Sequence, residues 1–190
     1  MKSAWIVGNT KGVAASLATE LGMSITDDIT DADVLLIDSL PVYHAQKIVI
    51  DKLVSEGRTA VFLQPPVGNY LVANDSVHVS KTIMGQYYFV SPSLQHSLMK
   101  PFKPNDFRLW YNSNKSLISP LLGEMSQMNG WVSLLTTGQT GWVSASEYAF
   151  AAAEKKSGKG VFRINHVQLD GRIKANPVAR QFAMLLIGNK

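Results

Sequence analysis

The first seventy residues constrain the fold most, because strand-like and helix-like segments alternate along them. Short apolar runs, each expected to be a strand, lie at residues 4–7, 23–26, 32–37 and 59–63. Between them lie two segments with apolar residues at helical spacing, residues 13–21 and 45–53, each followed by a glycine stop, Gly22 and Gly57. This order requires right-handed crossovers, so it predicts a parallel sheet with helices on both faces.

The middle of the chain departs from this regular order. Residues 67–142 hold three of the four tryptophans, and only two short strands are expected there, at residues 77–79 and 87–90. We interpret this stretch as an irregular, aromatic-rich insertion. The length of 190 residues is that of one ordinary domain, so we expect residues 1–190 to form a single α/β domain.

Regular order is expected to return at Ser144. Ser144 and Glu147 match a capping box, with Val143 and Tyr148 placed as its hydrophobic staple. The pattern predicts a helix through the alanine-rich residues 149–154 to Lys156, with Gly158 just beyond its end.

The last thirty residues predict one strand and a closing helix. The strand is expected at residues 161–164, and Asn176 is expected to cap a helix that starts with Pro177. Its core stripe consists of Val178, Phe182, Leu185 and Leu186. The whole pattern predicts a three-layer α/β sandwich with a mostly parallel sheet and flavodoxin-like character.

Composition excludes several functions. The chain has no cysteine, which rules out disulfides, thiol nucleophiles and thiolate metal sites. Its net charge of +4 is mild and its Lys and Arg are scattered, which argues against nucleic acid as a partner. No apolar run is as long as a membrane span, and no signal peptide is visible. Because the sequence opens inside a strand, we expect it to be a domain of a longer polypeptide.

Two loops at strand ends are candidates for ligand binding. The backbone of residues 8–12 could cradle a phosphate, with Thr10 and Gly12 similar to the phosphate loop of flavodoxins, although a plain strand-to-helix turn fits too. Asp38 could bind a ribose or a metal, but Asp38-Ser39 also suits a turn or helix cap. We expect no metal and no cofactor.

His166 and Gln168 form the sharper candidate, since alternate side chains at a strand end point the same way. Here the chain resembles the class I glutamine amidotransferase-like superfamily, in which the last core strand ends in His-Pro-Glu and a Cys on an earlier turn is the nucleophile. The resemblance places that turn at Gln64-Pro65-Pro66, which offers no nucleophile, and Gln168 cannot stabilise an imidazolium as a carboxylate does. His166 and Gln168 are therefore interpreted as remnants of a lost catalytic triad, and rescue by Ser39 or Ser91 has no support in their spacing.

Further segments resemble amidotransferase-like domains of glycoside hydrolases, including those towards the C-terminus of family 2 β-galactosidase-like enzymes. They are residues 95–98, 105–110, 158–160, 166–170 and 176–179. The resemblance implies an accessory role in packing, in oligomer contacts or in shaping the mouth of an active site. It also implies a periplasmic or secreted location if the parent enzyme degrades polysaccharides.

The leading hypothesis is thus a non-catalytic accessory domain of a β-galactosidase-type glycoside hydrolase, whose partners are other domains of that enzyme or an oligomer partner. One alternative is a carbohydrate-binding module, since aromatic rings can stack on sugars; its ligand-binding candidates are Trp110, Tyr111 and Trp131. A flavin- or nucleotide-binding protein that uses Thr10 and Gly12 is also consistent with the sequence, as is a residual serine hydrolase.

Overall fold

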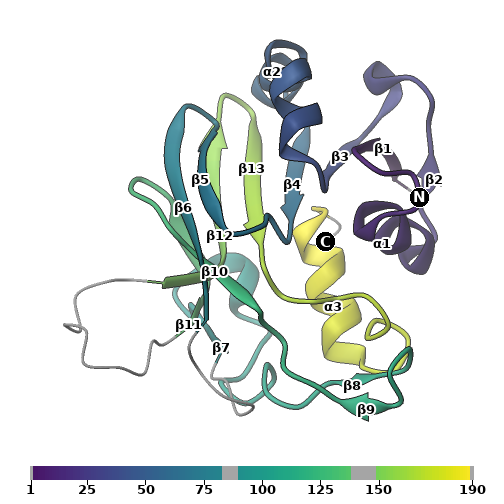
Figure 1. The fold of residues 1–190 in the computed structure, drawn as a ribbon, viewed down its shortest axis with the longest axis vertical. Coiled ribbons are helices and arrows are strands. Elements are labelled where there is room, and N and C mark those ends of the chain that lie inside the picture. The colour runs from purple at the N-terminus through teal and green to yellow at the C-terminus, as the bar shows by residue number, and fades with distance from the viewer. Residues whose placement is uncertain (1, 83–89, 138–148, 189–190) are drawn as a thin grey trace.

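The computed structural model describes residues 2–82, 90–137 and 149–188 (Figure 1). Its first part alternates strands and helices as the sequence predicts. The elements are β1 (Ser3–Val7), α1 (Val13–Leu21), β2 (Ser24–Ile25), the 3-10 turn η1 (Ile29–Asp31), β3 (Val34–Ile37), α2 (Leu40–Ser55) and β4 (Thr59–Leu63). The predictions for these elements are confirmed, although α2 starts earlier than expected, at Leu40.

Local chemistry accounts for these elements. All four residues of β3 are buried, as expected for a strand covered on both faces. Helix α1 ends at Gly22, which takes a left-handed φ of 71° and donates its N–H to the carbonyls of Ala18 and Thr19. The glycine stop predicted for α1 is therefore confirmed.

The rest of the described chain is dominated by strands. They are β5 (Gly68–Val72), β6 (Asp75–Lys81), β7 (Val90–Pro92), β8 (Tyr111–Asn112), β9 (Leu117–Ile118), β10 (Glu124–Gln127), β11 (Val132–Thr137), β12 (Ala149–Ser157) and β13 (Gly160–Asn165). A 3-10 turn, η2 (Ser97–Met99), and the closing helix α3 (Pro177–Leu186) complete the described elements. The strand predicted at residues 77–79 lies in β6 and is confirmed, whereas of residues 87–90 only Val90, the first residue of β7, is described.

Eleven of these strands form one mixed sheet. Its main path runs β2-β1-β3-β4-β13-β12-β10-β6-β5, with β11 paired to β12 and β7 paired to β11. Strands β2, β1, β3, β4 and β13 are parallel, and every pairing beyond β13 is antiparallel. Strand β13 is therefore where the parallel half meets the antiparallel half.

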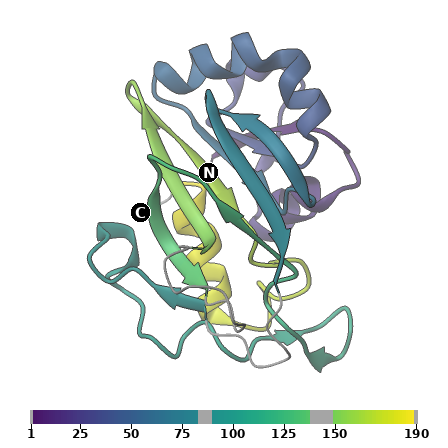
Figure 2. The same cartoon turned by 60° about the vertical axis from the view of Figure 1, so that its left-hand side comes forward.

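The predicted fold class, a three-layer flavodoxin-like or amidotransferase-like sandwich with a mostly parallel sheet, is wrong. The described residues contain only three α-helices, and the antiparallel half of the sheet curls like an open half-barrel (Figures 1 and 2). The error has a physical cause. The β-α-β-α-β signal ends at β4. Beyond it, hairpins such as β5–β6 and β12–β13 join the sheet through strands far away in sequence, as β6 does with β10 and β13 with β4.

The helix predicted through residues 149–156 is also wrong, because the described part of this stretch is strand β12. All residues from Ala149 to Glu154 are buried, so the strand is covered on both faces and burial overrides the helical preference of alanine. Gly158 is not a helix stop but the first residue of a two-residue hairpin turn, with φ 58°. The expected cap and staple, Ser144, Glu147, Val143 and Tyr148, lie outside the described residues.

Two hydrophobic clusters cover the two faces of the sheet. On one face, α1 and α3 pack together, with Leu17 and Phe182 among the buried residues. On the other face, α2 packs with the β5–β6 hairpin, which the curl of the sheet brings over β4 and β13 (Figure 2). Tyr43 of α2 joins the two, because its hydroxyl accepts the N–H of Ala73 at 3.2 Å.

Helix α3 begins at Pro177 and follows Asn176, as predicted. Phe182 and Leu186 of the expected core stripe are buried, and Val178 and Leu185 are partly buried. The Asn176 side chain does not cap the helix. It accepts the N–H of Tyr111 at 3.1 Å and donates to the Tyr111 carbonyl at 2.8 Å, so it holds β8 against the start of α3.

A buried ion pair crosses from β12 to β13. Arg163 Nε donates to Glu154 Oε2 at 2.9 Å, and Arg163 Nη1 donates to the carbonyls of Leu185 and Leu186 at 2.8 and 2.6 Å. His96 Nδ1 accepts the N–H of Leu98, so its other nitrogen, Nε2, carries the proton that it donates to Glu154 at 3.0 Å. Every charge of the pair is thus satisfied.

Removing one partner of this pair should be costly. We expect Arg163→Met to lower the free energy of unfolding by about 3–5 kcal/mol, because it leaves the Glu154 carboxylate buried without its cation. Urea unfolding followed by circular dichroism measures the loss. The matched control is Lys52→Met, which breaks the exposed Lys52–Glu56 pair and should cost less than about 1 kcal/mol. Equal losses in the two variants would contradict this account.

Candidate functional site

The polar strand ends of the parallel half meet at one edge of the sheet. A pocket of about 580 Å³ opens there, lined by Gly8, Asn9, Gly12, Val13, Asp38 and Ser39. These residues follow β1 and β3, which are paired neighbours. The sequence therefore predicted the place of this pocket, since ligands of open α/β sheets bind beyond the carboxyl ends of the strands.

Asp38 fills the loop that could have cradled a phosphate. Its carboxylate accepts the backbone N–H of Asn9 at 3.0 Å and that of Ala14 at 3.2 Å. A Cβ on Gly8 would lie 1.9 Å from Asp38 Oδ1, and a Cβ on Gly12 would lie 2.1 Å from Asp38 Oδ2. The two glycines are therefore needed for the close approach of the protein's own carboxylate, which occupies the position where an anionic ligand would have to bind.

With Asp38 bound to these two backbone N–H groups, the pocket can still act as a hydrogen-bond acceptor. The free lone pairs of the carboxylate, with the Asn9 amide and the Ser39 hydroxyl, can accept hydrogen bonds from hydroxyl or ammonium groups. A second anion would be repelled. Across the described ranges, no group of three or more His, Asp or Glu side chains converges in a way that could hold a metal ion.

Gln64 adopts an uncommon backbone conformation at the end of β4. Its φ is 49°, in the left-handed region, which costs a residue with a side chain roughly 1–2 kcal/mol. Its N–H donates to the Asn165 carbonyl at 2.8 Å, which ties β4 to β13. This turn is where the amidotransferase resemblance places a nucleophile, and it carries an amide followed by Pro65 and Pro66.

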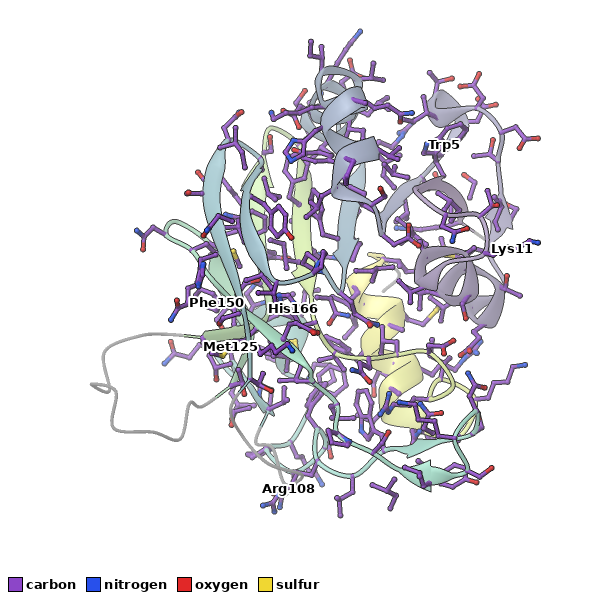
Figure 3. All side chains as sticks on the ribbon, in the orientation of Figure 1. Trp5, Lys11, Arg108, Met125, Phe150 and His166 are labelled. Atoms are coloured by element: carbon purple, nitrogen blue, oxygen red, sulfur yellow. The ribbon has the colours of Figure 1, made fainter. Side chains whose placement is uncertain are left out.

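His166 lies in the interior of the protein, in the same region as Met125 and Phe150 (Figure 3). Its Nε2 is 2.5 Å from the hydroxyl oxygen of Ser126 on β10, and both residues are 0% exposed. Its Nδ1 has no hydrogen-bond partner within the described residues. Desolvation by burial lowers the pKa of His166 to about 3, so the imidazole is neutral at physiological pH.

Ser126 is the partner of His166 that sequence reasoning missed. It lies forty residues before His166, on a strand whose pairing the sequence does not reveal. Of the serines considered from the sequence, Ser39 lines the pocket and Ser91 lies on β7. Because Ser126 and His166 are sealed from solvent, this pair cannot meet a dissolved substrate.

The structure does not join His166 to Gln168. Strand β13 ends at Asn165, whose side chain accepts the N–H of Val167 and donates to its carbonyl, so the chain turns before Gln168. The Gln168 N–H donates to the Leu121 carbonyl, and its own carbonyl accepts from Arg172. The regular strand geometry on which the pairing of His166 and Gln168 rests therefore stops at Asn165, one residue before His166.

The three aromatic candidates differ in exposure. Trp110 is 3% exposed and donates its indole N–H to the Asp106 carbonyl. Trp131 is 7% exposed and donates to the Asp75 carboxylate. Tyr111 is 42% exposed, so of the three only Tyr111 presents a ring to solvent.

Comparison with known proteins gives likeness in structure only. No protein-family model and no curated protein sequence matches the chain. A cold-adapted β-galactosidase from Rahnella sp. R3 matches with a TM-score of 0.56 and 13% identity, over 97% of this chain and 31% of that chain. A catalytic mutant of Gan42B, a GH42 β-galactosidase from G. stearothermophilus, matches with a TM-score of 0.54 and 11% identity, over 97% of this chain and 29% of that chain.

A cytoplasmic protein from Salmonella typhimurium LT2 matches over its whole length, with a TM-score of 0.57, 10% identity, and 98% of both chains covered. The chain therefore spans about a third of the β-galactosidases that it matches and nearly all of this bacterial protein. Identities of this size establish the fold alone. The likeness to a β-galactosidase domain is confirmed at that level, but the family of the matched Gan42B is GH42 and not the predicted family 2. These matches lend no support to the amidotransferase likeness.

The buried histidine should make stability depend on pH. His166 takes up a proton near pH 6.5 in the unfolded chain but only near pH 3 in the folded chain. The neutral, buried His166 therefore contributes its full share to the free energy of unfolding above pH 6.5, and this contribution is lost as the pH drops below 6.5. When the pH is lowered from 6.5 to 5, we expect the free energy of unfolding to fall by about 1.5 kcal/mol more in the protein with His166 than in the His166→Gln variant. Urea unfolding at several pH values tests this. The control variant His44→Gln changes an exposed histidine and should show the same dependence of unfolding free energy on pH as the unchanged protein. If His166→Gln shows that same dependence too, His166 is not its source.

The close approach of the Asp38 carboxylate to Gly12 makes a separate prediction. We expect Gly12→Ala to destabilise the protein by about 1–3 kcal/mol, because the new Cβ must displace the Asp38 carboxylate from two backbone donors. The double variant Gly12→Ala/Asp38→Ala should cost clearly less than the sum of the two single variants, since both remove the same contacts. Unfolding midpoints measure all three, and simple additivity would show that Gly12 and Asp38 are not coupled.

Proposed function

We propose that this chain is a non-catalytic accessory domain of a β-galactosidase-type glycoside hydrolase. It acts by packing against other domains of that enzyme or against an oligomer partner. The observation that carries the proposal is the fold match, in which this whole chain corresponds to about a third of two β-galactosidase chains.

The surroundings of Asp38, Gln64 and His166 support a non-catalytic role. Asp38 is engaged by backbone donors, the turn at Gln64 has no nucleophile, and His166 is fully buried. A general base must reach the proton that it abstracts, and a nucleophile must reach its substrate. Asp38 is thus committed to holding the fold together, and the capacity left at this sheet edge, from the Asn9 amide and the Ser39 hydroxyl, is for hydrogen bonding.

The two binding alternatives have less support. A flavin or nucleotide phosphate would meet the Asp38 carboxylate in the loop of Gly8 and Gly12. Of the three aromatic candidates for a carbohydrate-binding surface, only Tyr111 is exposed, because Trp110 and Trp131 are buried. Isothermal calorimetry with β-galactosides at millimolar concentration separates this alternative from the proposal, which expects no heat of binding.

The proposal predicts a physical association with β-galactosidase activity in the cells that make the protein. Antibodies raised against the purified chain should remove most of the activity towards a chromogenic β-galactoside from a cell extract, because the chain and the catalytic part form one particle. Antibody blocked beforehand with the purified chain is the control. If the chain is depleted while the activity stays in the supernatant, the proposal fails.

A further inference from the structure

The ribbon of β8 and β9 has an outward face of unusual composition. It lies at the end of the molecule opposite to α2 (Figure 1). Burial alternates along residues 109–112: Trp110 and Asn112 are 3% exposed, while Leu109 and Tyr111 are 63% and 42% exposed. Ile118 pairs with Tyr111 across the ribbon and is 56% exposed. Leu117, which pairs with Asn112 on the other face, is also 48% exposed, so the ribbon is covered on one face along β8 and open on both faces along β9. An antiparallel ribbon normally turns polar side chains to solvent, and here the exposed face shared by Leu109, Tyr111 and Ile118 is mainly apolar.

The ribbon is held firmly against the loop that leads into α3. Asn176 brackets Tyr111 with two hydrogen bonds, and Asn112 Nδ2 donates to the Asp170 carbonyl at 3.1 Å. The backbone and side chain of Ser113 both donate to the Gly171 carbonyl at 2.7 Å. A surface fixed in this way loses little conformational entropy when it binds, which favours recognition of a partner.

Buried Arg172 fixes the other strand of the ribbon. Its guanidinium, fully buried, donates to the carbonyls of Ser119 and Pro120 just after β9, and to the Gln168 carbonyl. It also donates to the Ser119 hydroxyl at 2.6 Å. Burying a cation among neutral acceptors is expensive, and desolvation lowers the pKa of Arg172 while the charge of Asp170 raises it. The desolvation cost of Arg172 therefore falls at the end of β9, next to the outward face of the ribbon.

The charges around this face are basic. Arg108 precedes Leu109 and lies at the same end of the molecule (Figure 3), Lys115 lies in the loop between β8 and β9, and Lys174 lies two residues before Asn176. Two carboxylates in the same segments accept hydrogen bonds from neutral donors of this chain: Asp106 accepts the N–H of Lys103, and Asp170 accepts from Ser16 and Asn114. The three cations outnumber these two carboxylates around the apolar face.

We propose that the outward face of the β8–β9 ribbon, made of Leu109, Tyr111 and Ile118, docks a folded protein surface with an apolar centre and a rim of carboxylates. A second copy of this chain fits poorly, because a two-fold contact would bring the cations of both copies together. A sugar fits poorly too, since two of the three side chains are branched aliphatics and not flat rings. The inference rests on the proposed accessory function and assigns the surface through which it acts.

Site-specific photo-crosslinking in the cells that make the protein tests this. A benzophenone amino acid replaces Tyr111 in one variant and Ile48, an 87% exposed residue of α2, in the control variant. We expect cross-linked peptides at position 111 from another folded protein, or from another domain of a longer chain, with Asp or Glu beside the attachment point. Thermal melting checks that both variants are folded.

Charge reversal makes the test quantitative. Lys115→Glu combined with Lys174→Glu should lower the cross-link yield at position 111 by about ten-fold, because it removes the attraction of the rim. Lys52→Glu on α2, at the opposite end of the molecule (Figure 1), should leave the yield unchanged. Cross-links to lipid, to sugar or to a second copy of this chain, no cross-link at all, or a yield that ignores the charge reversal would each overturn the inference.

The outcomes also separate this inference from the proposed function. A carboxylate-rimmed partner that is no glycoside hydrolase would leave the docking surface in place and refute the accessory role in a β-galactosidase. Depletion of β-galactosidase activity without a cross-link at position 111 would support the accessory role and refute this docking surface.

Discussion

The buried guanidinium of Arg163 is the contact on which the other parts of the fold converge. It neutralises Glu154 on the neighbouring strand, which in turn accepts from His96, and it binds the last carbonyls of α3. It lies on β13, where the parallel half of the sheet meets the antiparallel half. A cation at a helix C-terminus is favourable because the carbonyl dipoles point towards it. One side chain thus joins both halves of the sheet to the helix that closes the core.

The polar groups at the strand ends are likewise used to hold the fold together. Asp38 serves the start of α1, Gln64 ties β4 to β13, and His166 contacts Ser126 across the sheet. Groups that could have done chemistry satisfy backbone donors or are sealed in the interior. The outward face of the β8–β9 ribbon shows the opposite pattern, because polar contacts on its inner side hold it in place while Leu109, Tyr111 and Ile118 expose mainly apolar surface.

Local signals in the sequence were reliable where one residue decides one structure. Gly22 marked the end of α1, Pro177 the start of α3, and the apolar run of residues 32–37 the buried strand β3. They failed at residues 149–154, where a run of alanines suits a helix in isolation but lies between two cores. The pairing of His166 with Gln168 was predicted from regular strand geometry, but β13 ends at Asn165, whose side chain bonds the backbone of Val167.

The sequence by itself determined the strands and helices from β1 to β4, the closing helix, and the absence of any cysteine chemistry, because these depend on short-range periodicity, caps and composition. Only the tertiary structure decided the antiparallel half of the sheet, the burial of His166 on Ser126, the filling of the glycine loop by Asp38, and the exposure of Tyr111 beside buried Trp110. Each of these depends on contacts between residues far apart in the chain. Pairing of distant strands sets which side chains are covered, and no local pattern encodes that choice.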